Sequence, residues 1–263
     1  MVRYNFPKVK YFRLNDNIGI AARNIGFSNA LGDIIITLDD DIVIGDDFDI
    51  STLVDLFETK KDIGAVCFKI LDEATKEVCN WCHHYKKEDY CDCEFITDEI
   101  TEGAVAFKKA VLEETGYYPT YFFISHEGHD LLCRMLDRGY KTIFSPQICV
   151  RHTTHPAGRT NWRRYYYDTR NQIWLAARNY PLMYGLKFLA KGLSTMLLYS
   201  IRDGFIKYWI KGVSDGIRDL PKVLRDRRPI SKNTISSLKA IASNRPSLFY
   251  LINQRLFKSE IRL

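Results

Sequence analysis

Short apolar runs alternate with amphipathic stretches through the first 150 residues of the chain. Ile34–Leu38 is a β-branched run that follows Gly32 and ends in carboxylates, a pattern typical of a buried strand. A helix at Ser51–Thr59 would begin with Ser51 as its N-cap. Further strands are expected at Val9–Leu14, Ala65–Ile70, Gly103–Phe107, Lys141–Phe144 and Ile148–Arg151, and further helices at Ile18–Leu31, Lys109–Thr115 and Gly128–Arg138. This alternation predicts an α/β fold with a mainly parallel sheet, interrupted by a polar, cysteine-rich excursion at Thr75–Phe95.

The pattern changes after His152. Thr160–Asn179 is expected to be helical and rich in aromatic residues, and Leu182–Leu220 alternates apolar clusters with lysines and arginines. Such a helix pair can lie in the headgroup region of a membrane or pack against the preceding domain, and the density of aromatics and cations favours the membrane surface. The tail from Arg225 is basic and expected to be loosely ordered. We therefore divide the chain into domains 1–158 and 159–263.

Charge is distributed unevenly between these two parts. Residues 1–150 carry 16 Lys and Arg against 26 Asp and Glu, whereas residues 151–263 carry 22 against 6. An acidic part that can hold a metal ion thus precedes a basic part suited to phosphates or an anionic bilayer. No signal peptide or run of 18 apolar residues is visible, and the seven cysteines fit reduced thiols in the cytoplasm.

The acidic triplet Asp39-Asp40-Asp41 follows the Ile34–Leu38 strand directly. Ligands of open α/β sheets bind at the carboxyl ends of strands. Asp39 and Asp41 are alternate residues on extended backbone, so their carboxylates could share one hard divalent cation. A solvated acidic turn is an equally good interpretation of this motif alone.

Three segments around the triplet strengthen the metal interpretation. They are Asn15–Asp33 (NDNIGIAARNIGFSNALGD), Phe122–Tyr140 (FFISHEGHDLLCRMLDRGY) and Pro146–His152 (PQICVRH). In this order and spacing they resemble family 2 glycosyltransferases of the GT-A fold, whose pattern runs N-x-G, A-R-N, D-x-D, E-D-x-D-L-x-x-R and then a late His. The resemblance covers roughly Lys8 to Pro181. It implies a GT-A-like (Rossmann-like) α/β domain in residues 1–158, followed by a helical extension.

The resemblance also implies a metal site. Asp39 and Asp41 match the D-x-D pair, with Asp41 the closer ligand of Mg²⁺ or Mn²⁺, and His152 matches the late His that completes the site. Asp39 or Asp40 would then lie nearer the ribose of the donor. Without the acidic triplet, a lone His would more often be structural.

Two sets of basic or polar residues are further donor-site candidates. By resemblance, Arg23 and Asn24 lie close to the donor nucleotide, where the Arg23 guanidinium could contact phosphate; an exposed helix arginine is nearly as good an interpretation. A basic cluster after His152 either binds a pyrophosphate or keeps its helix soluble. Its members are Arg159, Arg163, Arg164 and Arg170.

The family's E-D-x-D element is altered in this chain, which has Glu127-Gly128-His129-Asp130. The second acid, frequently the general base, is glycine here. We therefore predict Glu127 as the base and Asp130 as its neighbour, pairing with Arg134 at i+4; the alternative gives Asp130 the base role. Acids in a first helical turn also stabilise the helix without any catalytic role.

Four cysteines in the excursion offer a possible second metal site. They are arranged as Cys79-x-x-Cys82 and Cys91-x-Cys93. Two cysteine pairs on a hairpin can bind structural Zn²⁺, with His83 and His84 nearby. C-x-C matches zinc knuckles poorly, so unrelated free thiols are the favoured interpretation.

Together these features predict an inverting, metal-dependent glycosyltransferase. It would move a sugar from a nucleotide-diphosphate donor to a cell-surface glycan, lipid-linked and reached at the inner face of the cytoplasmic membrane. The family's usual N-terminal strand-helix-strand unit has no counterpart before Asn15, so we expect an N-terminally truncated domain. The alternative is a catalytically inactive scaffold that binds membrane or partner enzymes. Nucleic-acid binding is not expected, because no recognition motif accompanies the basic segment.

Overall fold

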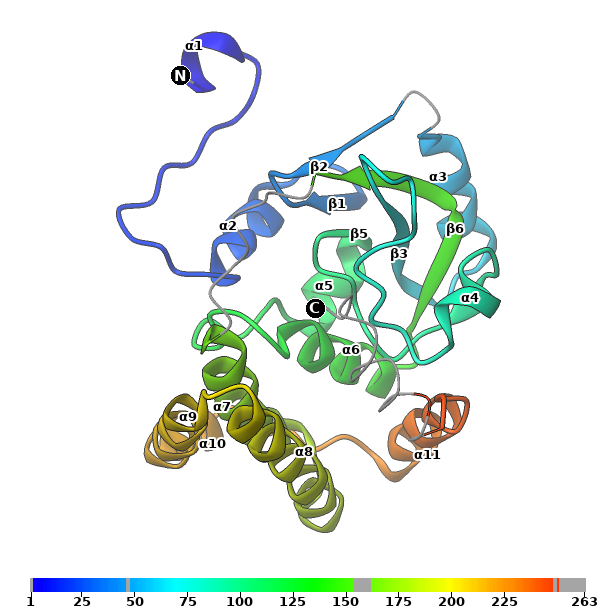
Figure 1. Ribbon diagram of the computed structural model, residues 1–263. Helices are drawn as coiled ribbons and strands as arrows, with labels where there is room; N and C mark the ends of the chain where they lie inside the picture. Colours follow the sequence, from blue (N-terminus) through cyan, green and yellow to red (C-terminus); the bar gives the residue numbers. More distant parts are fainter. Residues whose placement is uncertain (1, 46–47, 154–161, 248–249, 251–263) are drawn as a thin grey trace.

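The computed structural model describes residues 2–45, 48–153, 162–247 and 250. Within these residues, one six-stranded sheet forms the centre of the molecule, with its main path ordered β1-β5-β3-β6-β2 and β4 paired to β6 (Figure 1). The strands are β1 (Ile34–Leu38), β2 (Ile42–Val43), β3 (Ile63–Asp72), β4 (Phe95–Ile96), β5 (Ala104–Lys108) and β6 (Lys141–His152). The two strands predicted at Lys141–Phe144 and Ile148–Arg151 are therefore one strand, with a register irregularity opposite Phe68 and Lys69.

The sheet is mostly antiparallel, so the prediction of a mainly parallel sheet is wrong. Within the described part, only β3 and β6 pair in parallel, while β1, β3, β2 and β4 each have an antiparallel partner. The reason is the connection between β3 and β5, whose one helix is the four-residue α4 (Lys87–Tyr90). Without a crossover helix the chain returns antiparallel, and β5 inserts between β1 and β3.

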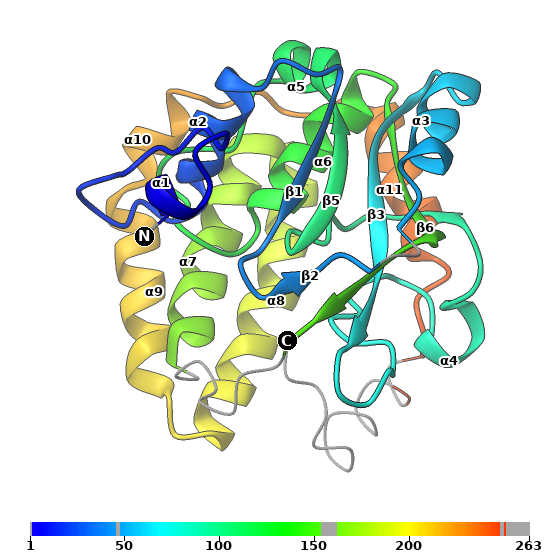
Figure 2. The same cartoon turned by 90° about the horizontal axis from the view of Figure 1, so that it is seen from above.

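Helices lie on the faces and at one end of this sheet (Figures 1 and 2). The helix predicted at Lys109–Thr115 is confirmed. The helix expected at Ser51–Thr59 is present but has a different N-cap: the Asp49 side chain, and not Ser51, caps it by accepting from the Ser51 N–H. Besides α4, the helices in the described residues are α1 (Val2–Asn5), α2 (Ala21–Asn29), α3 (Ile50–Thr59), α5 (Lys109–Thr115), α6 (Glu127–Asp137), α7 (Trp162–Asn179), α8 (Leu182–Arg202), α9 (Ile206–Arg218), α10 (Leu220–Leu224) and α11 (Lys232–Ala242).

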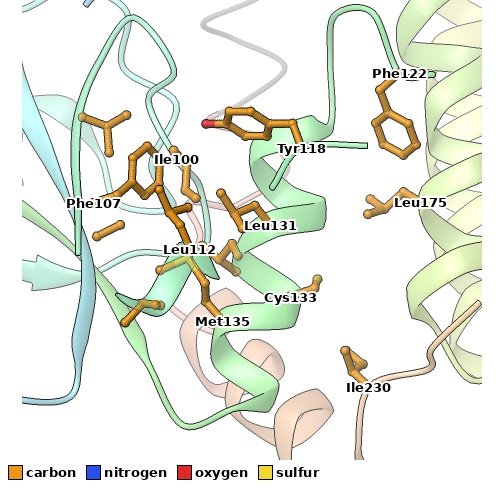
Figure 3. Close-up of a cluster of buried hydrophobic side chains, with 14 of the residues drawn as sticks. Ile100, Phe107, Leu112, Tyr118, Phe122, Leu131, Cys133, Met135, Leu175 and Ile230 are labelled. Carbon is orange, nitrogen blue, oxygen red and sulfur yellow. The ribbon is translucent and has the colours of Figure 1, made fainter. Parts of the chain in front are cut away.

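The larger hydrophobic core joins the sheet to the C-terminal helices. Figure 3 shows Phe107 and Leu112 on the sheet side, Leu131 on α6 between them and the next layer, and Leu175 of α7 beyond. All four side chains are fully buried. At about 25 cal/mol per Å² of apolar surface, such burial stabilises each large side chain by roughly 1.5–3 kcal/mol. Helix α7 is therefore part of the same core as α6.

The N-terminal segment does not form the strand predicted at Val9–Leu14. Residues 4–18 are exposed, and Figure 1 shows this segment arching away from the sheet. A strand is stable only where a neighbouring strand pairs with its backbone. Within the described residues, the one partner of β1 is β5, so the segment at Val9–Leu14 does not pair with the free edge of β1.

Within the described residues, the basic tail after Arg225 packs against the rest of the molecule, contrary to the expectation that it is loosely ordered. Ile230 is buried, the Ser231 hydroxyl caps α11, and the Arg245 guanidinium lies 2.6 Å from the buried Asp98 carboxylate. Helices α8 and α9 pack against α7 (Figure 2). In the stretches that the structure describes, none of the helices combines the length and the apolar composition needed to cross a membrane.

Candidate active site

The acidic turn after β1 is positioned by antiparallel pairing on two sides. Leu38 pairs with Ala104, and the Asp39 N–H continues the ladder by donating to the Gly103 carbonyl at 2.9 Å. Ile42 pairs with His152, and the Thr153 N–H donates to the Asp41 carbonyl at 2.8 Å. The turn is thus held between the start of β5 and the end of β6.

Arg23 of α2 binds the first acid of this turn. Its guanidinium forms an ion pair with the Asp39 carboxylate, donates to the Glu102 carbonyl, and lies 3.8 Å from the Glu102 carboxylate. Its side chain is 20% exposed, so it is not the freely exposed helix arginine considered from the sequence. The Asp39–Arg23 pair turns this carboxylate toward α2 and Glu102.

Asp41 and His152 lie together at the other end of the turn. His152 Nε2 is 3.3 Å from Asp41 Oδ2, and the buried Asp41 Oδ1 has no hydrogen-bond partner. For the ranges described by the structure, no three His, Cys, Asp or Glu side chains gather as a metal site. The predicted trio is therefore a pair, because Asp39 is bound to Arg23. A carboxylate oxygen without a partner beside an imidazole fits Mg²⁺ or Mn²⁺, which bind few protein ligands and add substrate phosphates.

Asp40 and Asn24, the other predicted donor-binding residues, lie in different surroundings. Asp40 is exposed at the tip of the acidic turn. The Asn24 side-chain amide donates to the Tyr118 carbonyl at 2.9 Å and accepts from the Tyr118 N–H at 3.1 Å. Asn24 therefore anchors the chain that follows α5, and its predicted contact with the donor stays a prediction.

Two carboxyl groups, each with one buried oxygen, feel the charge of Arg23. The pKa of Glu102 is raised to about 8, mainly by burial and also by the charge of Glu127, while Arg23 and the hydrogen bond from Tyr118 oppose the rise. Burial likewise raises the pKa of Glu127 to about 7, opposed by Arg23 and assisted by the charge of Asp168. Carboxyl groups with such pKa values can take up and release protons near neutral pH.

Sequence reasoning missed Glu102. In a mainly parallel sheet the residue before β5 would not meet the residue after β1, and the antiparallel register is what brings Glu102 next to Asp39 and Arg23. A usable signal was present, since Glu102 is a carboxylate two residues before the fully buried run Ala104–Phe107. A charged residue is rarely placed at such a position without a partner or a function.

A strained loop places Glu127 at the start of α6. Phe123, Ser125 and His126 all have positive φ values, 67°, 79° and 64°, a backbone conformation that is costly for residues other than glycine. Asn171 of α7 holds this loop, because its side-chain amide donates to the carbonyls of Phe122, Ile124 and Ser125 at 2.7–3.0 Å.

The same loop also contacts the N-x-G element. The Ile20 N–H donates to the Phe123 carbonyl at 2.7 Å, and Gly19 has φ +63°. A Cβ at Gly19 would lie 2.1 Å from the Phe123 carbonyl oxygen, so only glycine fits there. The donor-side motif and the loop before Glu127 are thus packed directly together.

Asp130 lies at the centre of a buried ion-pair network. Its carboxylate is fully buried, with Oδ2 2.8 Å from Arg134 Nη2 and Oδ1 2.9 Å from Arg178 Nε, and it accepts from the Asn179 amide. The predicted i+4 pair with Arg134 is confirmed. Three partners and complete burial make Asp130 a structural link between α6 and α7, which argues against the alternative of Asp130 as the base.

The predicted basic cluster after His152 is not a cluster of free cations. Arg170 is buried, with its guanidinium 4.1 Å from the centre of the Trp174 ring and Nη2 donating to the Phe122 carbonyl. Arg164 pairs with Asp168 at 3.7 Å, and Arg163 is exposed. Arg159 lies outside the described residues. Arg170 therefore supports the loop before Glu127 and does not keep the helix soluble.

The four cysteines of the excursion do not form the zinc site that the sequence offered as the less favoured interpretation. Among the described residues no metal-binding group of three or more ligands is present, and all four thiols are free. Cys82 faces the Thr101 hydroxyl, and Cys91 faces the neighbouring Asp92. Burial raises the pKa of Cys79 to about 11, which disfavours the thiolate that zinc requires. The free-thiol interpretation fits this arrangement.

Comparisons with known proteins agree with this fold. Residues 2–116 match the family model described as Glycosyl transferase family 2. An uncharacterized protein of Haemophilus influenzae is 31% identical over 113 residues, which are 41% of this chain and 60% of that protein. The chain thus spans about 60% of the length of this curated relative.

Solved structures show the same fold at low sequence identity. GalNAc-T7, crystallised with UDP, GalNAc and Mn²⁺, is 16% identical with a TM-score of 0.56, over 82% of this chain and 47% of that one. Residues 1–349 of S. aureus TarS, in complex with UDP-GlcNAc, are 14% identical with a TM-score of 0.54, over 86% of this chain and 69% of that one. The α/β domain therefore has a GT-A-like fold, with helices following it.

Proposed function

Because the chain carries a domain of glycosyl transferase family 2, we propose that it transfers a sugar from a nucleotide-diphosphate donor to a glycan acceptor, with inversion at the anomeric carbon. The observation that carries this proposal is that the fold provides two complementary groups, one in the acidic turn after β1 and one at the start of α6. The Asp41–His152 pair can hold a metal ion, and the buried Glu127 can accept a proton. Both tasks are required when a hydroxyl displaces a diphosphate.

In the proposed reaction each group has a separate task. Asp41 and His152 hold Mg²⁺ or Mn²⁺, which when bound neutralises the charge of the leaving diphosphate. Glu127 takes the proton of the acceptor hydroxyl while the hydroxyl oxygen bonds to the anomeric carbon and the bond from that carbon to the diphosphate breaks. Arg23, paired with Asp39, holds the first acid of the turn in place.

The direct test is donor binding. We expect calorimetry with a panel of nucleotide sugars to give a saturable heat with at least one donor in the presence of Mn²⁺, and a much weaker one after chelation, because the Asp41–His152 pair and the donor phosphates share the ion. Heat from no donor would favour the alternative, an inactive scaffold. The engagement of Asp39 by Arg23 favours this alternative.

We further propose that the acceptor is reached at an anionic membrane surface, through helices α8 and α9. Leu182, Met183 and Leu186 are 69%, 67% and 51% exposed at the start of α8. Lys187 and Lys191 are exposed on the following turns. Exposed apolar side chains beside lysines complement acyl chains and anionic headgroups. In this proposal the protein acts at the inner face of the cytoplasmic membrane, and its acceptor is a lipid-linked glycan.

Replacing both Met183 and Leu186 by glutamate is expected to lower binding to vesicles containing anionic phosphatidylglycerol by on the order of tenfold or more, because two buried apolar contacts are lost and two like charges are added. Cosedimentation measures the bound fraction. The matched control is Leu31→Glu, which alters a leucine that is 96% exposed near β1. Equal binding by the double variant and the wild type would contradict the membrane proposal.

A further inference from the structure

Gly128, the residue that departs from the family pattern, faces the carboxyl group of Glu102. A Cβ at position 128 would lie 2.3 Å from Glu102 Oε1 and 3.2 Å from Ile100 Cβ. The Glu102 carboxyl therefore occupies the space that a side chain at position 128 would enter. Because Gly128 follows Glu127 directly, this space adjoins the candidate base.

Glu102 and Glu127 each keep one buried carboxyl oxygen without a hydrogen-bond partner, Oε1 of Glu102 and Oε2 of Glu127. Burying a polar atom without a partner destabilises a fold, so stability alone does not explain these two oxygens. The other oxygen of Glu102 accepts from the Tyr118 hydroxyl. This bond holds Glu102 in place and leaves Oε1 for another partner.

We propose that Glu102 supplies the carboxyl group that position 128 lacks, and that Glu102 and Glu127 act as a pair in accepting the proton of the acceptor hydroxyl. This inference rests on the proposed glycosyl transfer and names a second residue for its acceptor side. Glu102 comes from the segment before β5 and Glu127 from α6, so the pair bridges two elements.

The proton balance of the pair follows from its surroundings. The charges of Glu102 and Glu127 repel each other, and Arg23, which lies 3.8 Å from Glu102, also pairs with Asp39; Asp130 and Asp168 add further negative charge near Glu127. The pair therefore holds one proton and one negative charge before reaction. The acceptor proton moves to the pair as the oxygen bonds to the anomeric carbon, the diphosphate leaves with the electron pair, and the extra proton then passes to solvent.

The test exchanges the carboxyl between the two positions. Glu102→Ala is expected to lower the rate of donor hydrolysis, in which water replaces the acceptor, by about 10²-fold or more, while donor binding measured by calorimetry with Mn²⁺ is retained. Adding Gly128→Asp to Glu102→Ala is expected to restore at least a tenth of the wild-type rate. Gly128→Ala in the Glu102→Ala background is the control, because it fills the space without a carboxyl.

Each outcome distinguishes the two proposals. If the wild type binds no nucleotide sugar, the proposed function fails and this inference fails with it. If the wild type binds and hydrolyses a donor and Glu102→Ala does so at the same rate, the pairing alone is overturned. If Gly128→Ala restores the rate as well as Gly128→Asp does, Glu102 serves packing only. Thermal denaturation of every variant confirms that the protein compared is folded.

Discussion

Replacing Asp41 by asparagine is expected to lower Mn²⁺-dependent turnover by on the order of 10²- to 10³-fold. The substitution keeps the size of the side chain but removes its charge, and it replaces one oxygen of a carboxylate whose Oδ1 is buried without a partner and whose Oδ2 lies 3.3 Å from His152. Asparagine binds divalent cations less strongly than a carboxylate does. Turnover is measured as donor hydrolysis across a Mn²⁺ titration.

Metal binding gives a second readout that does not depend on activity. We expect the electron paramagnetic resonance signal of free Mn²⁺ to fall when wild-type protein is added with a nucleoside diphosphate, and to fall much less with Asp41→Asn. The control is Asp33→Asn, which changes the same charge at the exposed, opposite end of β1. Unchanged Mn²⁺ binding by Asp41→Asn would show that this carboxylate does not hold the ion.

The parts of the fold that local pattern determines were predictable. The β-branched run of β1 and the acids behind it lie where the sequence placed them, and α5 and α6 match their predicted ranges to within one residue at each end. In these segments burial, turn chemistry and helix periodicity all favour the same structure. The proximity of Asp41 and His152 was also anticipated, because both follow strands of the same sheet.

What the sequence did not reveal depends on contacts between distant segments. The direction of β5 is set by the excursion after β3, which has no periodic pattern that distinguishes a hairpin-like return from a crossover. When the direction of a strand is predicted wrongly, the residues at its two ends are assigned the wrong neighbours. Glu102 was missed for this reason. The ordering of the basic tail likewise depends on a buried partner, Asp98, which lies 147 residues before Arg245.

Replacing Asp130 by alanine is expected to lower the free energy of unfolding by about 3–5 kcal/mol, because the change leaves Arg134 and Arg178 buried without their shared anion. Arg134 also donates to the carbonyls of Gly116 and Tyr117, so the loss of its anion disturbs the chain that follows α5. Urea denaturation measures the effect as a lower midpoint. The matched control is Asp226→Ala, which removes the half-exposed anion that the same Arg178 contacts at 3.4 Å and should cost less than about 1 kcal/mol.

The asparagine variant of Asp130 separates the structural role from the alternative role as a base. If Asp130 links α6 and α7, Asp130→Asn should lose much of the stability that alanine loses, because the two arginines still lack a negative partner. Its turnover per folded molecule should change far less than that of Glu127→Gln. If instead Asp130→Asn unfolds at the wild-type urea concentration and turns over no donor, Asp130 acts on the acceptor proton, and the carboxyl pair of Glu102 and Glu127 loses that task.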